Sequence, residues 1–430
     1  MYTLTNVTIE GFWGKYTINT DLKDNVNIFI GKNGSGKTTF INLLESVISV
    51  NVEKLYNHQF ESIILQLVNK KSTKKITVTK KALDVQYKEI TYQIGTNKYR
   101  IPILSNRDLK SFSVSSGRAI ARPFRESFQI KNEIKKIVNL SFLSVSREKL
   151  FDDLITERNQ NDLYNPIDNR LQQLMTDLTS YQLQLETEVN KLSKKFQEDV
   201  LRNMLFNDNF DIIDLTKPFT MNIDEISKGL SRAYDVLGIL DVATMVIIEN
   251  HISALKKSAD KINSSLKQSA EKITVYANDV TPLALFRRTE KIIDLSTELD
   301  ESKKRIFEKL DNYINLLNDF HETKYFTLGE SNKGTINITK DNSPILPSEL
   351  SSGEKQLLIL LTETLLQRGQ QTIFIADEPE LSLHIEWQRK IISSIQELNP
   401  NSQIILATHS PEIVGKYKDR LINMSRIINE

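Results

Sequence analysis

Residues 31–38 read Gly-Lys-Asn-Gly-Ser-Gly-Lys-Thr, and this run limits the possible folds more than any other part of the chain. It follows an apolar run at 26–30 and opens an amphipathic run at 39–44, so the expected local structure is a strand, a glycine-rich loop and a helix. Glycines let backbone N–H groups turn inward onto phosphate oxygens, and the helix that follows adds its N-terminal dipole. The pattern therefore predicts a phosphate-binding loop rather than a plain glycine turn.

Several residues of this loop have a specific expected use. Lys37 is expected to reach the β- and γ-phosphates of a nucleotide, and the Thr38 hydroxyl is expected to ligate Mg²⁺. The predicted nucleotide-binding residues of the loop are Asn33, Gly34, Ser35, Gly36, Lys37, Thr38 and Thr39.

The composition is ordinary for a soluble protein, and the length suggests two domains. Of the 430 residues, 39% are hydrophobic and 26% charged, and no apolar run reaches the roughly 18 residues of a membrane span. The absence of cysteine excludes disulfides and cysteine nucleophiles, and the five histidines form no close pair suited to zinc. The first residues lack the charged and apolar regions of a secretion signal, so a cytoplasmic location without membrane contact is expected.

Positive charge is concentrated in one part of the chain, although the net charge is only +1. Residues 69–149 contain 19 Lys and Arg against 6 Asp and Glu, an excess of 13 positive charges. This segment is either a solvated surface that acidic neighbours neutralise or a face for nucleic acid or an acidic protein. Composition does not separate these two readings.

The first 150 residues are expected to be rich in strands. Stretches at 2–20 and 63–103 alternate between strand-like and turn-like sequence, which favours an antiparallel sheet. We expect a helix at 40–55, a mobile loop in the Ser- and Arg-rich stretch 105–128, and a strong strand at 137–145. Candidates for stacking on adenine, with core packing as the alternative for each, are Phe12, Trp13 and Tyr16.

The middle of the chain changes to a helical period. Leucines and other apolar residues recur at three- and four-residue steps over 169–204 and again over 283–320, with further helices expected at 223–273. These helices form either a protruding coiled-coil hairpin or an ordinary bundle. The predicted domains are an N-terminal lobe at 1–150, a helical insertion at 151–330 and a C-terminal lobe at 331–430.

Chemistry-bearing residues return in the last 80 residues. A Ser/Gly loop with Ser351 and Gly353 precedes a helix, which alone is a weak indication of an anion site. Two apolar strands follow, one ending in Asp377 and Glu378 and the other ending in His409. Because ligand sites lie at the carboxyl ends of parallel strands, Asp377 is expected to hold Mg²⁺, Glu378 to orient the attacking water, and His409 to contact the γ-phosphate.

Together these motifs resemble the head of an ABC-type ATPase, in the SMC/OLD-like branch that contains the AAA_15 and AAA_21 families. The resemblance implies an α/β fold, a P-loop ATPase head with a mixed sheet and an antiparallel β lobe, into which an α-helical, coiled-coil-like domain is inserted. It implies ATP and Mg²⁺ as cofactors, with Lys37, Glu378 and His409 in catalysis and Thr38 and Asp377 at the metal. It also implies composite sites, in which Ser351 and Gly353 of one subunit meet the nucleotide of another. The family's glutamine loop is not evident, and Arg147 stands near its expected place.

The resemblance leaves three interpretations of the chain, each a different branch of this class. Leu350 lies 312 positions after Thr38, and this long separation disfavours a transporter subunit. An SMC- or repair-like DNA-binding ATPase is the second reading. The preferred reading is an ATPase subunit of a two-component antiphage defence system, which resembles the PARIS ATPase AriA most and otherwise Septu PtuA or OLD proteins. Only 20 residues follow Ser410, so a nuclease would be a separate protein.

The defence reading implies a set of partners. These are further copies of the chain, an effector nuclease of the TOPRIM or HNH type, and a phage trigger protein, for which an acidic protein would suit the basic segment; DNA is an additional candidate. A scaffold that binds ATP and hydrolyses it slowly is the non-enzymatic alternative.

Overall fold

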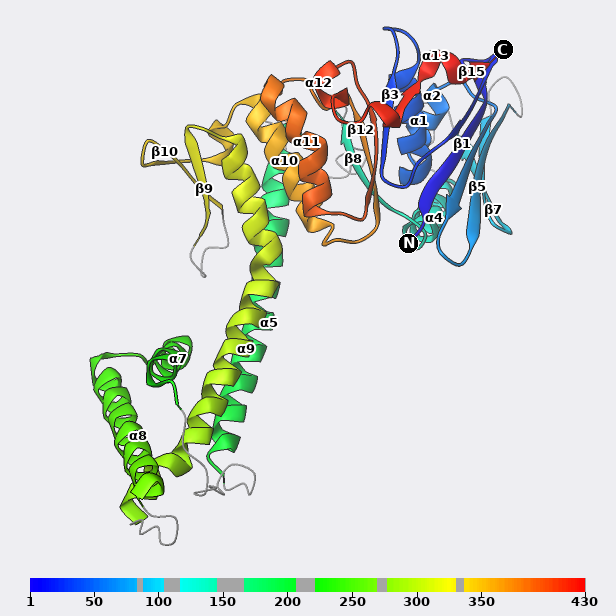
Figure 1. The fold of residues 1–430 in the computed structure, drawn as a ribbon. Helices are drawn as coiled ribbons and strands as arrows, with labels where there is room; N and C mark the ends of the chain where they lie inside the picture. The colour runs from blue at the N-terminus through cyan, green and yellow to red at the C-terminus, as the bar shows by residue number, and fades with distance from the viewer. Residues whose placement is uncertain are drawn as a thin grey trace. The chain divides into compact units, whose positions relative to one another are not determined.

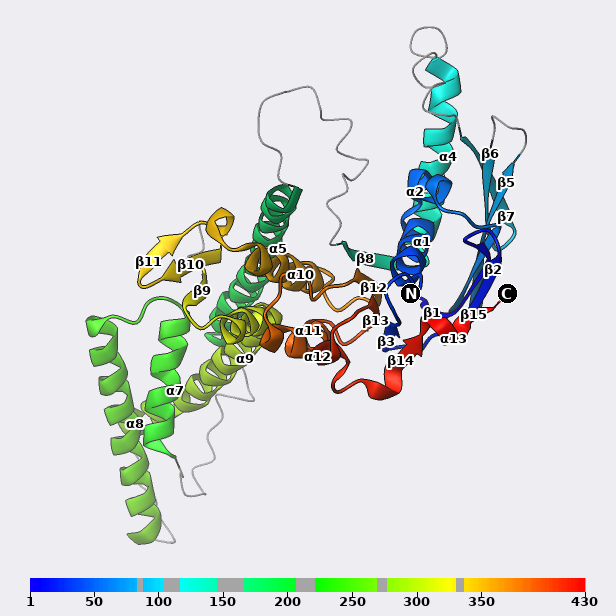
Figure 2. The ribbon, with the colours of Figure 1, turned by 90° about the horizontal axis from the view of Figure 1, so that it is seen from above.

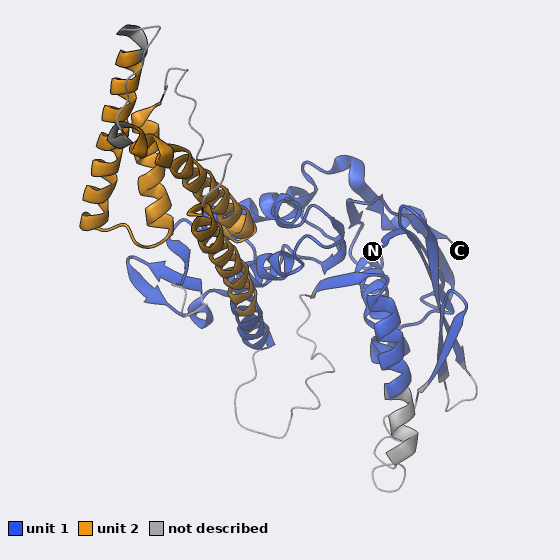
Figure 3. Ribbon diagram, turned by 90° about the horizontal axis from the view of Figure 1, so that it is seen from below, with its two compact units in different colours: residues 1–179, 312–430 blue, residues 180–311 orange. Residues whose placement is uncertain are grey.

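The computed structural model describes residues 1–82, 88–103, 117–144, 166–205, 221–268, 277–329 and 336–429. The chain forms two compact units, coloured separately in Figure 3. The first unit combines residues 1–179 with 312–430, and the second consists of residues 180–311. The chain therefore leaves the first unit once and returns to it for its last part (Figure 1).

A seven-stranded antiparallel sheet forms the N-terminal lobe of the first unit. Its strand order is β15-β2-β1-β4-β5-β6-β7, and all its neighbouring strands run antiparallel. The strands are β1 (Thr3–Phe12), β2 (Tyr16–Asp21), β4 (Ser62–Val68), β5 (Thr73–Ala82), β6 (Lys88–Ile94), β7 (Asn97–Ile103) and β15 (Ile428–Asn429). Alternate residues of β4 are buried in the core of the lobe, as expected for a sheet with one covered face, and β1 follows the same pattern except at two register shifts.

A five-stranded parallel sheet lies beside this lobe, in the order β14-β3-β13-β12-β8 (Figure 2). Its strands are β3 (Val26–Ile30), β8 (Asn139–Ser144), β12 (Thr372–Asp377), β13 (Ser402–Ala407) and β14 (Leu421–Asn423). The central strands β12 and β13 are almost wholly buried, which is why their sequences are continuous apolar runs. All five strands end at the same edge, and the loops after β3, β12 and β13 meet there. The α/β head with an antiparallel lobe is confirmed.

The remaining elements of the first unit are helices around the parallel sheet and a small sheet. The helices are α1 (Lys37–Ser49), α2 (Val52–Asn57), α4 (Gly117–Lys135), α10 (Ser352–Leu366), α11 (Ile385–Leu398), α12 (Pro411–Val414) and α13 (Met424–Ile427). The small antiparallel sheet consists of β9 (Lys324–Leu328), β10 (Ile336–Lys340) and β11 (Ser343–Ile345).

Two local expectations were wrong. Residues 117–128, expected in a loop, begin α4, since arginine favours helix and Ile130 and Ile134 give the helix a buried side; residues 105–116 of that expected loop lie outside the described residues. The helix expected at 40–55 is two helices, because Val50 adopts the left-handed conformation (φ 59°) and Asn51 caps the next helix.

Both long helices of the insertion are attached to α10 within the first unit. At the start of α5 (Pro166–Asn203), Asp168 Oδ1 accepts from Lys355 Nζ at 2.7 Å. Near the end of α9 (Ala277–Phe320), the Tyr313 hydroxyl shares a buried 2.7 Å hydrogen bond with Thr362. The helix α10 thus follows the Ser351 loop and contacts both the start of α5 and the end of α9.

The second unit has a helical core of its own. Its helices α7 (Ile223–Val236) and α8 (Val242–Gln268) pack on the first part of α9 through Leu230, Leu255 and Phe286. The end of α5 is joined to α9 by a hydrogen bond from Asn203 Nδ2 to the Arg288 carbonyl. The described part of the insertion is therefore helical, with the long helices α5 and α9 linked and α7 and α8 packed on α9. Within the described part of the chain, no helix is both long and apolar enough to span a membrane.

Candidate active site

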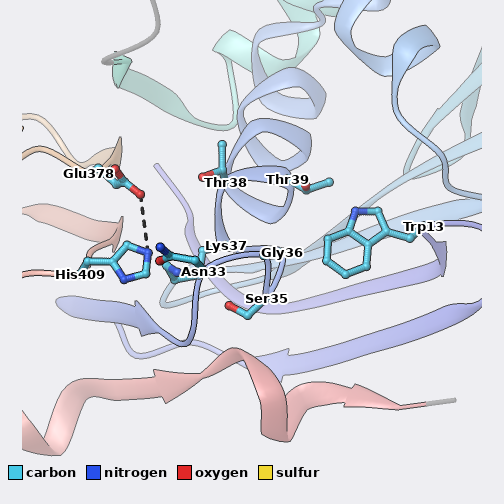
Figure 4. A pocket seen from close by; sticks show the side chains of 10 residues that line it. Trp13, Asn33, Ser35, Gly36, Lys37, Thr38, Thr39, Glu378 and His409 are labelled. Atoms are coloured by element: carbon cyan, nitrogen blue, oxygen red, sulfur yellow. Dashed lines mark ion pairs between the residues drawn. The ribbon is translucent and has the colours of Figure 1, made fainter.

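A pocket of about 590 Å³ opens at the carboxyl edge of the parallel sheet (Figure 4). The loop between β3 and α1 forms its floor, Trp13 lies at one end, and Glu378 and His409 lie at the other. The structure thus brings together residues from four separate parts of the sequence. The lining residues are Trp13, Asn33, Gly34, Ser35, Gly36, Lys37, Thr38, Thr39, Glu378 and His409.

The glycine-rich loop has the backbone that an anion cradle requires. Gly34 (φ 76°) and Gly36 (φ 89°) both adopt the left-handed conformation, which other residues rarely take. Gly36 is also the N-cap of α1 and offers no side-chain cap, so the first N–H groups of the helix have no capping partner. This combination suits a phosphate at the helix N-terminus.

Lys37 lies on the inside of this loop. The side chain is buried, and its Nζ donates to the carbonyl oxygens of Gly31 at 3.1 Å and Lys32 at 3.3 Å. Burial lowers the pKa of Lys37, while the nearby carboxylates of Glu378 and Asp377 act in the opposite direction. The loop therefore places a single buried amine between the glycine backbone and the acidic residues.

The two residues expected at the metal lie together. Thr38 Oγ1 donates to Asp377 Oδ1 across 3.4 Å, although 339 positions separate them in sequence. Burial raises the pKa of Asp377, and the nearby Glu378 and Glu380 raise it further. A hydroxyl and a carboxylate are hard oxygen donors that fit Mg²⁺, which keeps most of its coordination for water and phosphate. In the described residues, no cluster of three or more His, Asp and Glu suits a metal held by protein alone.

Glu378 and His409 face each other at the end of the pocket. Glu378 Oε1 lies 3.7 Å from His409 Nε2, and both side chains are partly exposed (29% and 38%). Glu378 has a positive φ of 46°, and its N–H donates to the carbonyl of Ala407 at the end of β13. This strained turn directs the chain out of the sheet immediately after Asp377.

The three aromatic candidates have different environments. Phe12 is wholly buried in the core of the lobe, whereas Trp13 is 39% exposed and lines the pocket. Their rings lie 4.8 Å apart, and Tyr16 meets Trp13 edge-on. Trp13 is therefore the aromatic side chain available to a base, supported by the other two.

Ser351 and Gly353 do not line this pocket. Ser351 caps α10: its Oγ accepts from the Glu354 N–H, and the Ser351 N–H donates to Glu354 Oε2. Their contact with a nucleotide depends on a second copy of the chain and stays a prediction. Arg147 lies outside the described residues.

Gly353 has a structural role that the sequence did not indicate. A Cβ at this position would lie 2.1 Å from the backbone carbonyl oxygen of Ser382, in the segment between Glu378 and α11. Only glycine lets α10 approach this segment so closely. The Ser351 loop is thereby packed directly against the chain that follows Asp377.

Replacing Gly353 with alanine is expected to lower the free energy of unfolding by about 1–3 kcal/mol, because the Ser382 carbonyl must move. Urea denaturation followed by tryptophan fluorescence measures this, since both tryptophans, Trp13 and Trp387, belong to the first unit. Ser352→Ala, at an exposed neighbouring position, is the control and should change stability by less than about 0.5 kcal/mol. Equal stability of both variants would show that the close approach is not needed.

Sequence reasoning also missed Glu380 and Gln388. Glu380 Oε1 accepts from the Thr408 hydroxyl and from the N–H groups of His409 and Ser410. Gln388 Oε1 accepts from the Ser410 hydroxyl at 2.7 Å. A glutamate two residues after Glu378 could have indicated one of them, but its partners lie about 30 residues away and are brought near only by the pairing of β12 with β13.

A parallel sheet with a glycine-rich phosphate loop after one strand and an acidic pair after another defines a P-loop ATPase head. A family model described as an AAA ATPase domain, AAA_15, matches residues 2–414. The chain belongs to this family.

Relatives of the chain include two proteins described as probable retron ATPases and the Septu protein PtuA. The retron Vc95 probable ATPase of Vibrio cholerae is 22% identical over 426 residues, which cover 96% of this chain and 70% of the relative. The retron Ec83 probable ATPase of Escherichia coli is 29% identical over 30% of this chain and 28% of its own length. The Septu protein PtuA of Bacillus thuringiensis is 29% identical over 21% of this chain and 26% of its own length.

Solved structures similar to the chain include SMC heads. One is the Smc head domain with an extended coiled coil from Pyrococcus furiosus, with a TM-score of 0.43, 13% identity, and coverage of 96% of this chain and 92% of that one. Another is the Smc head domain with a coiled coil and joint from Pyrococcus yayanosii, with a TM-score of 0.40, 14% identity, and coverage of 98% and 95%.

Proposed function

We propose that the chain hydrolyses ATP with Mg²⁺ at the pocket in Figure 4 and uses this cycle as the sensor and scaffold subunit of an antiphage defence system. The observation that carries the ATPase proposal is that five polar side chains lie close together at one edge of the parallel sheet. They are Lys37, Thr38, Asp377, Glu378 and His409. In this proposal the loop and Lys37 bind the phosphates, and Thr38 and Asp377 hold Mg²⁺, which would neutralise charge on the phosphates. Glu378 orients the attacking water, and His409 contacts the γ-phosphate.

We further propose that two copies complete each site, with Ser351 and Gly353 of one facing the nucleotide of the other. Large apolar side chains near the Ser351 loop support this, because they are exposed on the single chain: Leu346 (65%), Leu381 (44%) and Ile385 (53%). Burying such residues between copies is favourable, since exposed apolar clusters commonly mark protein interfaces. ATP at the interface then joins the copies, and hydrolysis releases them.

The defence role rests on the relatives. Retron ATPases and Septu PtuA match this chain, and by analogy the oligomer holds a separate nuclease effector and releases it on a phage trigger. The PARIS ATPase remains an alternative model for the same arrangement. A cytoplasmic location follows from this role.

The defence role is tested by recovering partners from the native host. Tagged Glu378→Gln protein, which should keep ATP bound, is expected to co-purify with a nuclease in a large oligomer, whereas a Lys37→Met control should recover less. Mass spectrometry and size-exclusion chromatography of the eluates measure both. A dimer that carries DNA and no nuclease would contradict the defence role.

That outcome would favour the second candidate, an SMC- or repair-like DNA-binding ATPase. The specific observation in its favour is a match to the chromosome partition protein Smc of Methanocaldococcus jannaschii, 23% identical over 263 residues, which cover 58% of this chain and 20% of that protein. The basic segment at 69–149 is compatible with both functions.

A further inference from the structure

Glu380 is a buried carboxylate that has no role in the scheme above. It lies three residues after Asp377, and only 9% of it is exposed. Its Oε1 accepts three hydrogen bonds from one turn, namely from Thr408 Oγ1 at 2.6 Å, His409 N at 2.8 Å and Ser410 N at 3.2 Å. Hydrogen bonds from backbone N–H groups to a carboxylate are among the stronger ones in proteins, so this oxygen holds the turn firmly.

The other carboxylate oxygen of Glu380, Oε2, is in an energetically unfavourable position. Oε2 is buried and has no hydrogen-bond partner among the described residues. Glu380 also lies close enough to Asp377 to raise its pKa, so a third carboxylate adds to the negative charge of the site. Leaving a buried carboxylate oxygen unpaired is unfavourable, and the three bonds through Oε1 offset part of this cost.

A second side chain connects the same two segments. Gln388 Nε2 donates to the carbonyl of Leu383 at 2.9 Å, and Gln388 Oε1 accepts from the hydroxyl of Ser410 at 2.7 Å. The turn after β13 is thus attached at two points to the segment after β12. In contrast, the His409 side chain is partly exposed, and its Nε2 lies 3.7 Å from Glu378 Oε1.

We propose that Glu380 is a positioning residue, which fixes the backbone of His409 and thereby sets the distance between the His409 ring and Glu378. This inference rests on the proposed ATPase function. Because the bonds reach the backbone N–H of His409 itself, a small shift of this turn moves the imidazole relative to the γ-phosphate position. Glu380 touches neither nucleotide nor water in this role and acts only through His409.

Two substitutions separate the hydrogen-bond acceptor from the charge. Glu380→Gln keeps an acceptor oxygen for the three donors and is expected to retain kcat within about 3-fold. Glu380→Leu removes the acceptor and should lower kcat by about 10- to 100-fold, a part of what a well-placed acid–base group contributes. The KM for ATP should change by less than about 3-fold, because the phosphate loop is untouched. Glu397→Leu, at an exposed site on α11, is the matched control.

A double-mutant cycle tests whether the effect passes through His409. In a His409→Ala background, Glu380→Leu should lower kcat by no more than about 2-fold, since the side chain it positions is gone. If Glu380→Leu lowers kcat in that background as much as it does in the wild type, the proposal is overturned. If Glu380→Leu does not fold, Thr408→Val removes one of the three hydrogen bonds and should show a smaller kcat loss with the same non-additivity.

The NMR resonance of the His409 side chain tests the positioning role of Glu380 without depending on ATP hydrolysis. The chain has five histidines, so the His409 resonance in a histidine-labelled sample can be assigned with His409→Ala. Glu380→Leu should shift this resonance and leave that of His251, in the second unit, unchanged. An unshifted His409 resonance would overturn the proposal even if the protein hydrolyses ATP. Absence of hydrolysis in the wild type, with the resonance shifted, would refute only the proposed function.

Discussion

Replacing Glu378 with glutamine is expected to lower ATP turnover by about 100- to 1,000-fold while leaving ATP binding intact. The reason is that an amide of the same size keeps the strained turn after Asp377 but cannot polarise a water molecule, and a group in this role contributes about 10²–10⁴-fold. The substitution should also trap an ATP-bound dimer, because hydrolysis no longer separates the copies.

Phosphate release measures the first effect, and size-exclusion chromatography with and without ATP measures the second. Glu397→Gln, on the exposed side of α11, provides a control that keeps the same change in charge. Turnover within about 3-fold of the wild type would show that Glu378 is not the residue that activates water. A monomer in the presence of ATP would contradict the composite site but not the assignment of Glu378.

Lys37→Met is expected to weaken ATP binding by about 100-fold. Lys37 is the buried amine within the glycine loop, and charge-assisted hydrogen bonds to phosphate are worth about 1.5–3 kcal/mol. The methionine keeps a side chain of similar length, so the loop should stay folded, although the bonds from Lys37 to the carbonyls of Gly31 and Lys32 are lost.

Isothermal titration with ATP and Mg²⁺ measures this affinity. Lys32→Met is a close control, because Lys32 belongs to the same loop but is exposed and does not line the pocket. An equal loss of ATP affinity in the two variants would indicate a general effect of positive charge near the site. Unchanged affinity in Lys37→Met would show that nucleotide binds elsewhere.

The class of fold was predictable because its signals are local. The phosphate loop is complete within residues 31–38, and its strand and helix adjoin it directly. Likewise, buried strands such as β12 and β13 must be apolar along their whole length, so their ends mark the edge where Asp377 and His409 were expected. The local pattern was misread at α4, where a Ser- and Arg-rich composition suggested a loop although arginine favours helix and Ile130 and Ile134 give the helix a buried side.

The sequence by itself therefore determined the P-loop head, the residue types of its site and the helical middle, because backbone geometry and strand burial depend on neighbouring residues. Only the tertiary structure decided that Trp13 is the aromatic side chain at the pocket, that Gly353 packs on the carbonyl of Ser382, and that Glu380 holds the turn carrying His409. These contacts join segments about 30 residues apart in sequence or, for Trp13, the turn between β1 and β2 with the loop after β3. Their physical basis is close approach between chain segments, which no local pattern of residues encodes.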